Sequence, residues 1–310
     1  MTSESFHPTV SSLVAQLQRV RDLQVRLDEP LSAHTSFRIG GPADVLCIPC
    51  SVRALQAALT IVGEHDAPLS VIGSGTNLLV RDGGVRGVTL KIDAHLGGIE
   101  YAGTRVGADA GAGLGAVATF AAERGLSGLE FAAGIPGSIG GAVVMNAGAH
   151  GGEMADVVER VEAFNRLGEP REYERDELRF GYRHSVLAES DDVVGRVWLR
   201  LSPGEPEDIR RRMADLARRR REAQPLELPS AGSVFKRPPG DYAGRLIEAA
   251  GLKGYAVGRA QVSEKHAGFI VNLGGATARD VLALVEQVRE TVRRQFGVEL
   301  EPEVRVIGED

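Results

Sequence analysis

The stretch Phe131-Ala132-Ala133-Gly134-Ile135-Pro136-Gly137-Ser138-Ile139-Gly140-Gly141-Ala142 decides the fold more than any other part of the chain. Four of the eight residues from 134 to 141 are glycine, and apolar residues stand on both sides of the run. Such clustering supplies backbone that takes positive φ, or that lies against a ligand with no side chain between. A surface hairpin requires neither this density nor the apolar flanks. The stretch therefore indicates main-chain amides that approach a large flat ring.

A second loop lies upstream, at Gly73-Ser74-Gly75-Thr76-Asn77, directly after the strand-like segment Leu69–Ile72. Its small residues let consecutive N–H groups converge on an anion, and its hydroxyl and amide side chains add donors, which suits a pyrophosphate. It is not a P-loop, because no Gly-Lys-Ser/Thr follows, and it lacks the third glycine and the helix of the dinucleotide fingerprint. Taken alone, the loop is equally consistent with a tight turn between strands.

The composition excludes several classes of protein. With 310 residues, 43% of them hydrophobic and 25% charged, the chain has the balance of a soluble globular protein of two or three compact units. The formal net charge of -6 argues against nucleic acid as a main partner. The sequence contains no run of 18 apolar residues, which a membrane-spanning helix would require. Its N-terminus does not resemble a signal peptide, so we expect a cytoplasmic protein.

Two local clusters favour structural roles. Cys47 and Cys50 form a Cys-x-x-Cys without further cysteine or histidine at metal spacing, which predicts two inert, partly buried thiols and no metal site. The arginine runs 210–212 and 218–221 fall in a helical stretch, where a solvated helix face is the first interpretation and a phosphate-facing role the alternative.

The periodicity of apolar residues outlines the elements. Residues 1–30 predict a short helix with Leu13 and Leu17 on one face and then a lead-in; Ser51 is placed to cap the next helix, and Gly125 to end a later one. Further helices are expected at 51–59, 112–124, 206–222, 241–250 and 278–296, and strands at 45–48, 69–72, 88–92, 99–106, 157–164, 192–201, 268–272 and 303–307.

The order of motifs resembles the UDP-N-acetylenolpyruvoylglucosamine reductase family over nearly the whole chain. The resemblance implies an α+β fold: an FAD-binding domain of the vanillyl-alcohol-oxidase (PCMH) type at 31–205, in subdomains of about 31–93 and 94–205. An N-terminal helix and lead-in (1–30), a helical connector (206–224) and a C-terminal α/β substrate domain (225–310) complete the expected organisation. The motifs that carry the resemblance are Thr35–Gly41, Gly73–Leu79, Ala133–Gly141, Phe180–Arg183, Ala231–Lys236 and Leu300–Arg305.

The same resemblance implies an activity: NADPH-dependent reduction, through non-covalent FAD, of the enolpyruvyl double bond of a UDP-amino sugar in peptidoglycan synthesis, by a cytoplasmic monomer. Another FAD oxidase or dehydrogenase of this fold is the alternative; a histidine or cysteine tether to the flavin would favour it, but His150 is expected to be an exposed loop residue. A non-enzymatic nucleotide-binding module is a third reading. The cofactor-binding residues implied are Gly73, Ser74, Gly75, Thr76, Asn77, Leu78, Gly134, Pro136, Gly137, Ser138, Gly140, Gly141 and Asn146.

Three residues stand where the family places its catalytic groups. A lone Ser233 without a His-Asp pair is not a triad nucleophile, and the resemblance implies instead that it gives a proton to the carbanion left by hydride transfer. Arg183 would hold the substrate carboxylate in two bonds. Glu303 would assist protonation or polarise the enol, and Arg305, two residues on, is expected on the same face of a strand. The alternative for that pair is a surface ion pair.

Basic residues are the candidates for contact with the diphosphate. Lys236 is a candidate for the diphosphate or NADPH. Relatives often carry lysine immediately before the Gln-Pro of residues 224–225, whereas this chain has Ala223, so Arg221 or Lys236 would take over that contact. The short segment between Arg183 and Asp192 leaves no room for a substrate-clamping insertion, which resembles the shorter, second class of the family.

Overall fold

The computed structural model describes residues 8–310, and the chain forms two compact units. The first unit comprises Val45–Ser74 and Gly87–Ala217 together with the N-terminal segment through Leu27. The second comprises Asp28–Asp44, Gly75–Arg86 and Arg218–Asp310. Both units are assembled from separate stretches of chain, whereas the domain ranges expected from the sequence are continuous; those ranges stay a prediction.

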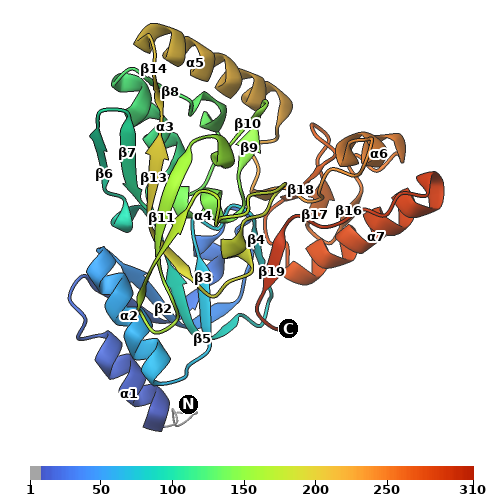
Figure 1. Ribbon diagram of the computed structural model, residues 1–310. Helices are drawn as coiled ribbons and strands as arrows, with labels where there is room; N and C mark the ends of the chain where they lie inside the picture. Colours follow the sequence, from blue (N-terminus) through green and yellow to red (C-terminus); the bar gives the residue numbers. More distant parts are fainter. Residues whose placement is uncertain (1–7) are drawn as a thin grey trace. The chain divides into compact units, whose positions relative to one another are not determined.

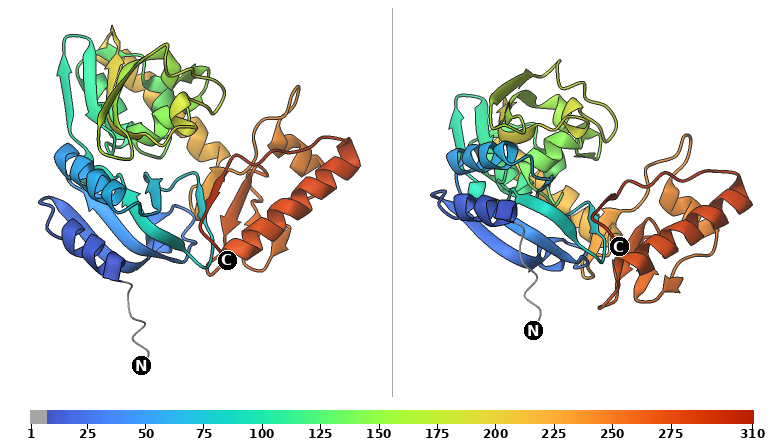
Figure 2. Two further views of the ribbon diagram at one scale, coloured as in Figure 1. Left: turned by 60° about the horizontal axis from the view of Figure 1, so that its bottom comes forward. Right: turned by 90° about the horizontal axis from the view of Figure 1, so that it is seen from below.

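The first sheet has the strand order β1-β2-β5-β3, and α1 and α2 lie side by side next to it (Figures 1 and 2). The Ser51 hydroxyl accepts a hydrogen bond from Ala54 N at 3.2 Å, so the predicted cap of α2 is confirmed. Leu55 and Leu59 on α2 and Leu17 on α1 are fully buried. The bounds are α1 Pro8–Leu17, β1 Leu23–Pro30, β2 Pro42–Pro49, α2 Val52–Glu64, β3 Leu69–Ile72, β4 Leu78–Val80 and β5 Val85–Lys91.

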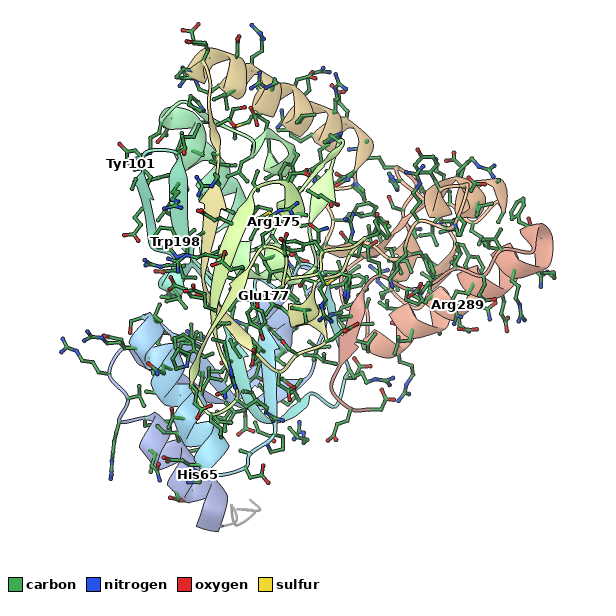
Figure 3. All side chains as sticks on the ribbon, viewed as in Figure 1. His65, Tyr101, Arg175, Glu177, Trp198 and Arg289 are labelled. Atoms are coloured by element: carbon green, nitrogen blue, oxygen red, sulfur yellow. The ribbon has the colours of Figure 1, made fainter. Side chains whose placement is uncertain are left out.

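The second sheet of the first unit is antiparallel, in the order β12-β11-β13-β7-β6. Trp198 lies on this sheet (Figure 3), where its Nε1 donates to Glu162 at 2.7 Å. The predicted strand at 99–106 is instead a hairpin that turns at Gly103, where φ is +60°. The bounds are β6 Ile99–Ala102, β7 Arg105–Asp109, α3 Leu114–Glu123, α4 Ile139–Val144, β11 Val158–Phe164, β12 Pro170–Glu174 and β13 Val193–Arg200.

The second unit is built around a sheet of order β15-β18-β17-β16, next to which α7 runs (Figure 1). Thr277 caps α7 in a reciprocal capping box, Gly297 ends it in the left-handed conformation, and the Asp82 carboxylate accepts from Ala278 N at 2.8 Å. Strand β19 pairs in parallel with β4. The bounds are β15 Ser230–Ser233, α6 Ala243–Ala249, β16 Ala256–Val257, β17 Ala260–Val262, β18 Phe269–Asn272, α7 Ala278–Phe296 and β19 Arg305–Ile307.

Helix α5 (Pro206–Ala223) confirms the predicted charged helix, with Ile209 as its buried residue. The remaining strands are short pairs, in which β9 joins β10 and β8 joins β14. Their bounds are β8 Leu126–Ser127, β9 Gly148–Ala149, β10 Gly152–Glu153 and β14 Ser202–Pro203. No helix among residues 8–310 is long and apolar enough to cross a membrane.

Two details of the elements differ from the sequence-based expectations. The glycine-rich stretch 134–152 contains α4, a helix that no pattern predicted. The final strand begins at Arg305, because a bend at Val304 interrupts it, so the alternation argument that put Glu303 and Arg305 on one face is wrong.

Cys47 is buried and its pKa is raised by burial to about 12, and both thiols are free, as expected of inert cysteines.

Candidate active site

The second glycine loop, in the first unit, has a backbone that only glycine fits. Gly134 and Gly137 have φ of +81° and +127°. A Cβ on Gly140 would lie 2.9 Å from the Cβ of Ala110, so no side chain has room there. The Ser138 hydroxyl begins α4 by accepting from Gly141 N at 3.4 Å. The density of glycine in the sequence thus reflects both torsion angles and close packing.

The first glycine loop contacts the second through Gly73. Strand β3 leads into Gly73, and a Cβ at that residue would lie 2.9 Å from the hydroxyl of Ser138. The two loops that the sequence singled out therefore meet, at residues of the first unit.

The rest of the first loop belongs to the second unit. Gly75 has a φ of +66°, and its carbonyl oxygen accepts from Ser36 N at 3.1 Å and from the Ser36 hydroxyl at 3.2 Å. A Cβ on Gly75 would lie 2.9 Å from the Cα of Thr35, and closer still to the carbonyl oxygen of His34. The loop is held in one shape by the segment 34–36.

These loops fit an FAD molecule. No side chain has room at Gly73 and Gly140 in the first unit or at Gly75 in the second, and Ser74 and Thr76 carry hydroxyl groups of the kind that donate to a pyrophosphate. The individual cofactor contacts at the thirteen expected positions stay predictions. Asn146 stands apart from the others, since its side chain is fully buried and its carboxamide bonds to main chain at both ends.

Ser233 and Glu303 lie on neighbouring main-chain segments of the second unit. Ser233 pairs with Phe269 of β18 on one side of β15. On the other side, Glu303 N donates to the carbonyl oxygen of Val234 at 2.7 Å, next to an antiparallel bridge between Phe235 and Pro302. Ser233 is exposed and Glu303 half-buried. Seventy residues apart in sequence, the two are fixed near each other by backbone hydrogen bonds.

Asn77 joins this pair to the first glycine loop. Its Nδ2 donates to the carbonyl oxygen of Glu303 at 3.2 Å, and its own carbonyl oxygen accepts from Arg305 N at 3.1 Å. Gly232, which directly precedes Ser233 and has a φ of +77°, lies close to the carbonyl oxygen of Thr76. In the second unit, residues 75–77 of the expected pyrophosphate loop therefore lie beside two of the three expected catalytic residues.

Arg183 belongs to the first unit and sits in a tight turn. Gly181 and His184 exchange backbone hydrogen bonds of 3.0 and 3.2 Å across that turn. The Arg183 guanidinium lies 5.0 Å from the centre of the Tyr182 ring, and its Nη2 donates to the carbonyl oxygen of Gly148 at 3.5 Å. Its φ of +54° is unusual for a residue with a side chain.

The basic residues near the end of α5 differ in their surroundings. Lys236 forms an ion pair with Glu301. The backbone carbonyl oxygen of Arg221 accepts a hydrogen bond from Nζ of Lys265 at 2.8 Å. Arg220 is half-buried, and burial lowers the pKa of its guanidinium. Its Nε has no hydrogen-bond partner in residues 8–310, and neither does Oε1 of Gln224, one turn later. Sequence reasoning passed over Arg220, because nothing distinguishes one arginine in a run of four.

Known proteins resemble this chain over almost its full length. A UDP-N-acetylenolpyruvoylglucosamine reductase of Caldanaerobacter subterraneus subsp. tengcongensis is 49% identical over 298 residues, covering 96% of this chain and 98% of the relative. One of Pediococcus pentosaceus is 52% identical over 289 residues, covering 93% and 96%. The chain belongs to the UDP-N-acetylenolpyruvoylglucosamine reductase family. The resemblance inferred from the ordered motifs is confirmed.

Family models and a solved structure agree with this membership. Residues 224–307 match the C-terminal domain of UDP-N-acetylenolpyruvoylglucosamine reductase, and residues 43–173 match an FAD binding domain. The crystal structure of the reductase from Thermus caldophilus has a TM-score of 0.79 and 42% identity, covering 92% of this chain and 98% of that one. The predicted fold, an α+β FAD-binding domain followed by a distinct C-terminal domain, is confirmed.

Proposed function

We propose that this protein is an FAD-dependent oxidoreductase that uses NADPH to reduce the enolpyruvyl double bond of UDP-N-acetylenolpyruvoylglucosamine, giving UDP-N-acetylmuramate for peptidoglycan. The observation that carries the proposal is the near-complete coverage of relatives with this name at about half identity. The second unit agrees with it, because Ser233 and Glu303 are tied by hydrogen bonds to the loop that carries Asn77.

FAD, once NADPH has reduced it, would supply a hydride to C3 of the enolpyruvyl group. Negative charge then accumulates at C2 and in the adjoining carboxylate, and C2 must receive a proton. Ser233, whose hydroxyl is exposed at the end of β15, gives this proton. Positioned proton transfer is worth roughly 10²–10⁴ in rate. Glu303 assists that transfer, because its backbone N–H bonds to Val234, the residue that follows Ser233.

Arg183 binds the substrate carboxylate. A guanidinium offers two parallel donors to a carboxylate, and those bonds strengthen as the carboxylate takes on enolate charge. The turn at Gly181–His184 and the stacking on Tyr182 hold the guanidinium in a defined place before substrate arrives. Because less freedom is lost on binding, pre-organisation of this kind favours both affinity and rate.

Arg220 is the basic residue that we assign to the diphosphate. A desolvated cation without an ion pair in the described part of the chain is costly in the free protein, and an anionic ligand would compensate it. Lys236 already has Glu301 as a partner, and we propose it, with Arg305 and Arg221, as a secondary contact. The individual roles of these four residues, a cytoplasmic location and a monomeric state are parts of the same proposal.

The experiment separates the two half-reactions. Purified protein is expected to carry FAD and to absorb in the oxidised flavin band at about 450 nm. This absorbance should disappear when NADPH is added without oxygen, and it should return when the enolpyruvyl sugar nucleotide is added. Reduction by NADPH without reoxidation by that substrate would support another flavin dehydrogenase instead.

A further inference from the structure

The turn that carries Arg183 is strained. Arg183 has a φ of +54°, and Arg179, just before the turn, has +47°. A left-handed backbone is unfavourable for residues with a Cβ, and it persists only where surrounding contacts determine it. Glycine or asparagine ordinarily occupies the third position of such a turn.

One of these contacts comes from Asn146, whose side chain is fully buried. Its Nδ2 donates to the carbonyl oxygen of Gly181 at 3.0 Å, and its Oδ1 accepts from Ala155 N at 2.9 Å. The carbonyl oxygen of Ala155 in turn accepts from Nε of Arg175 at 2.9 Å; Figure 3 labels this arginine. Both ends of the Asn146 carboxamide are thus bonded to main chain within the protein, in a side chain that is fully buried.

Ser185 fixes the other side of the turn. It is fully buried, and its hydroxyl donates to the carbonyl oxygen of Val144 at 2.8 Å. Val144 is the last residue of α4, and Asn146 follows two residues later. The turn is therefore tied at 181 by Asn146, at 183 by Gly148 and at 185 by Val144, and all three ties lead to the segment 144–148 that ends the second glycine loop.

We propose that Asn146, assisted by Ser185, is a positioning residue for Arg183: its buried carboxamide anchors the strained turn to the end of the glycine loop and so orients the guanidinium toward the substrate. The inference rests on the proposed function, because it assumes that Arg183 binds the substrate carboxylate. It differs from a cofactor role for Asn146 in a measurable way. A positioning role affects the step that uses the substrate, whereas a cofactor role affects the flavin first.

Two variants of Asn146 separate these roles. Asn146→Gly tolerates the local φ of +42° and removes both hydrogen bonds. Asn146→Asp keeps the size and the acceptor for Ala155 N, but it sets a carboxylate oxygen against the carbonyl oxygen of Gly181. Asn165→Gly is the matched control, because Asn165 also bonds main chain through its side chain, accepting from Leu167 N at 2.9 Å, in the β11–β12 turn.

The measurement is anaerobic stopped-flow absorbance on the FAD-loaded proteins. For both Asn146 variants we expect NADPH to reduce the flavin within about threefold of the wild-type rate, while reoxidation by the enolpyruvyl substrate slows at least tenfold and its half-saturating concentration rises. Asn146→Asp is expected to be the more severe. Asn165→Gly should change neither half-reaction. If the Asn146 variants do not fold, Ser185→Ala, which deletes a single oxygen atom, is expected to show the same selective loss.

Other outcomes would contradict either the positioning role of Asn146 or the proposed function. Wild-type reoxidation kinetics in Asn146→Gly would refute the positioning role. Loss of FAD, or an equal loss of both half-reactions, would assign Asn146 to the cofactor instead. Failure of the substrate to reoxidise even the wild-type protein would refute the proposed function, and it is visible in the same experiment before any variant is compared.

Discussion

Replacing Gly75 by alanine tests whether the first glycine loop must keep its observed shape. The residue has a φ of +66°, which costs an L-residue about 1–2 kcal/mol. The new Cβ would lie 2.9 Å from Thr35 Cα, about half an ångström inside the 3.4 Å at which ordinary contacts begin. Overpacking of this kind costs a further ~1–3 kcal/mol. The combined cost is therefore at least about 2 kcal/mol, or roughly thirtyfold in an equilibrium constant.

We expect this cost to appear in FAD affinity, because the loop must move away from the segment 34–36 to admit the methyl group. The assay is titration of apoprotein with FAD, followed by quenching of flavin fluorescence, with a thermal melt of the apoprotein beside it. Gly115→Ala is the matched control: Gly115 lies in α3, its Cβ would meet nothing within 4 Å, and alanine should stabilise the helix by ~0.5–1 kcal/mol. Wild-type FAD affinity and an unchanged melting temperature in Gly75→Ala would refute the reasoning.

Three further predictions concern single side chains. Thr89 is fully buried in β5 and its hydroxyl has no hydrogen-bond partner in residues 8–310, so Thr89→Val should stabilise the protein by about 1–3 kcal/mol; a lower melting temperature would show that the hydroxyl is satisfied. Arg220→Gln should raise the KM for the sugar nucleotide about tenfold while leaving NADPH reduction unchanged, whereas Arg210→Gln on the exposed part of α5 should change neither; equal KM values would remove Arg220 from the diphosphate site. Burial lowers the pKa of His266 below 6.5, so the folded state favours the neutral ring, and the stability that this provides above pH 6.5 is lost as the pH falls through the folded pKa. His266→Gln should therefore lose less stability than the wild type between about pH 7 and pH 5 in denaturant titrations, and an identical loss would argue against this residue.

Elements with a strong local signal could be predicted from the sequence. The bounds of α7 and β3 agree residue for residue with the expectation, since α7 has a sustained apolar stripe, a capping box at Thr277 and a left-handed Gly297. Helix α4 could not be predicted, because glycine and β-branched residues have low helix propensity and tertiary packing against Ala110 decides the outcome.

Long-range relations were beyond local patterns. The segments 28–44 and 75–86 join the second unit through bonds such as that from the Ser36 hydroxyl to the carbonyl oxygen of Ser230, at 2.7 Å. The resemblance to a family identified Ser233 and Glu303, but the backbone pairing that fixes them next to Asn77 appears only in the fold. Asn146 was expected among the cofactor ligands from its position in the loop, and the bonds of its carboxamide to the main chain of Gly181 and Ala155 appear only in the fold.

The most direct test of the account is the reaction of NADPH-reduced Ser233→Ala with the enolpyruvyl sugar nucleotide, followed at the flavin band without oxygen. The substitution removes one exposed hydroxyl at the end of β15 and should leave the fold and the FAD loops intact. We predict that NADPH reduces the variant at the wild-type rate, and that reoxidation by the substrate slows by roughly 10²–10⁴. Reoxidation at the wild-type rate, or an equal loss of both half-reactions, would contradict a proton-donating Ser233.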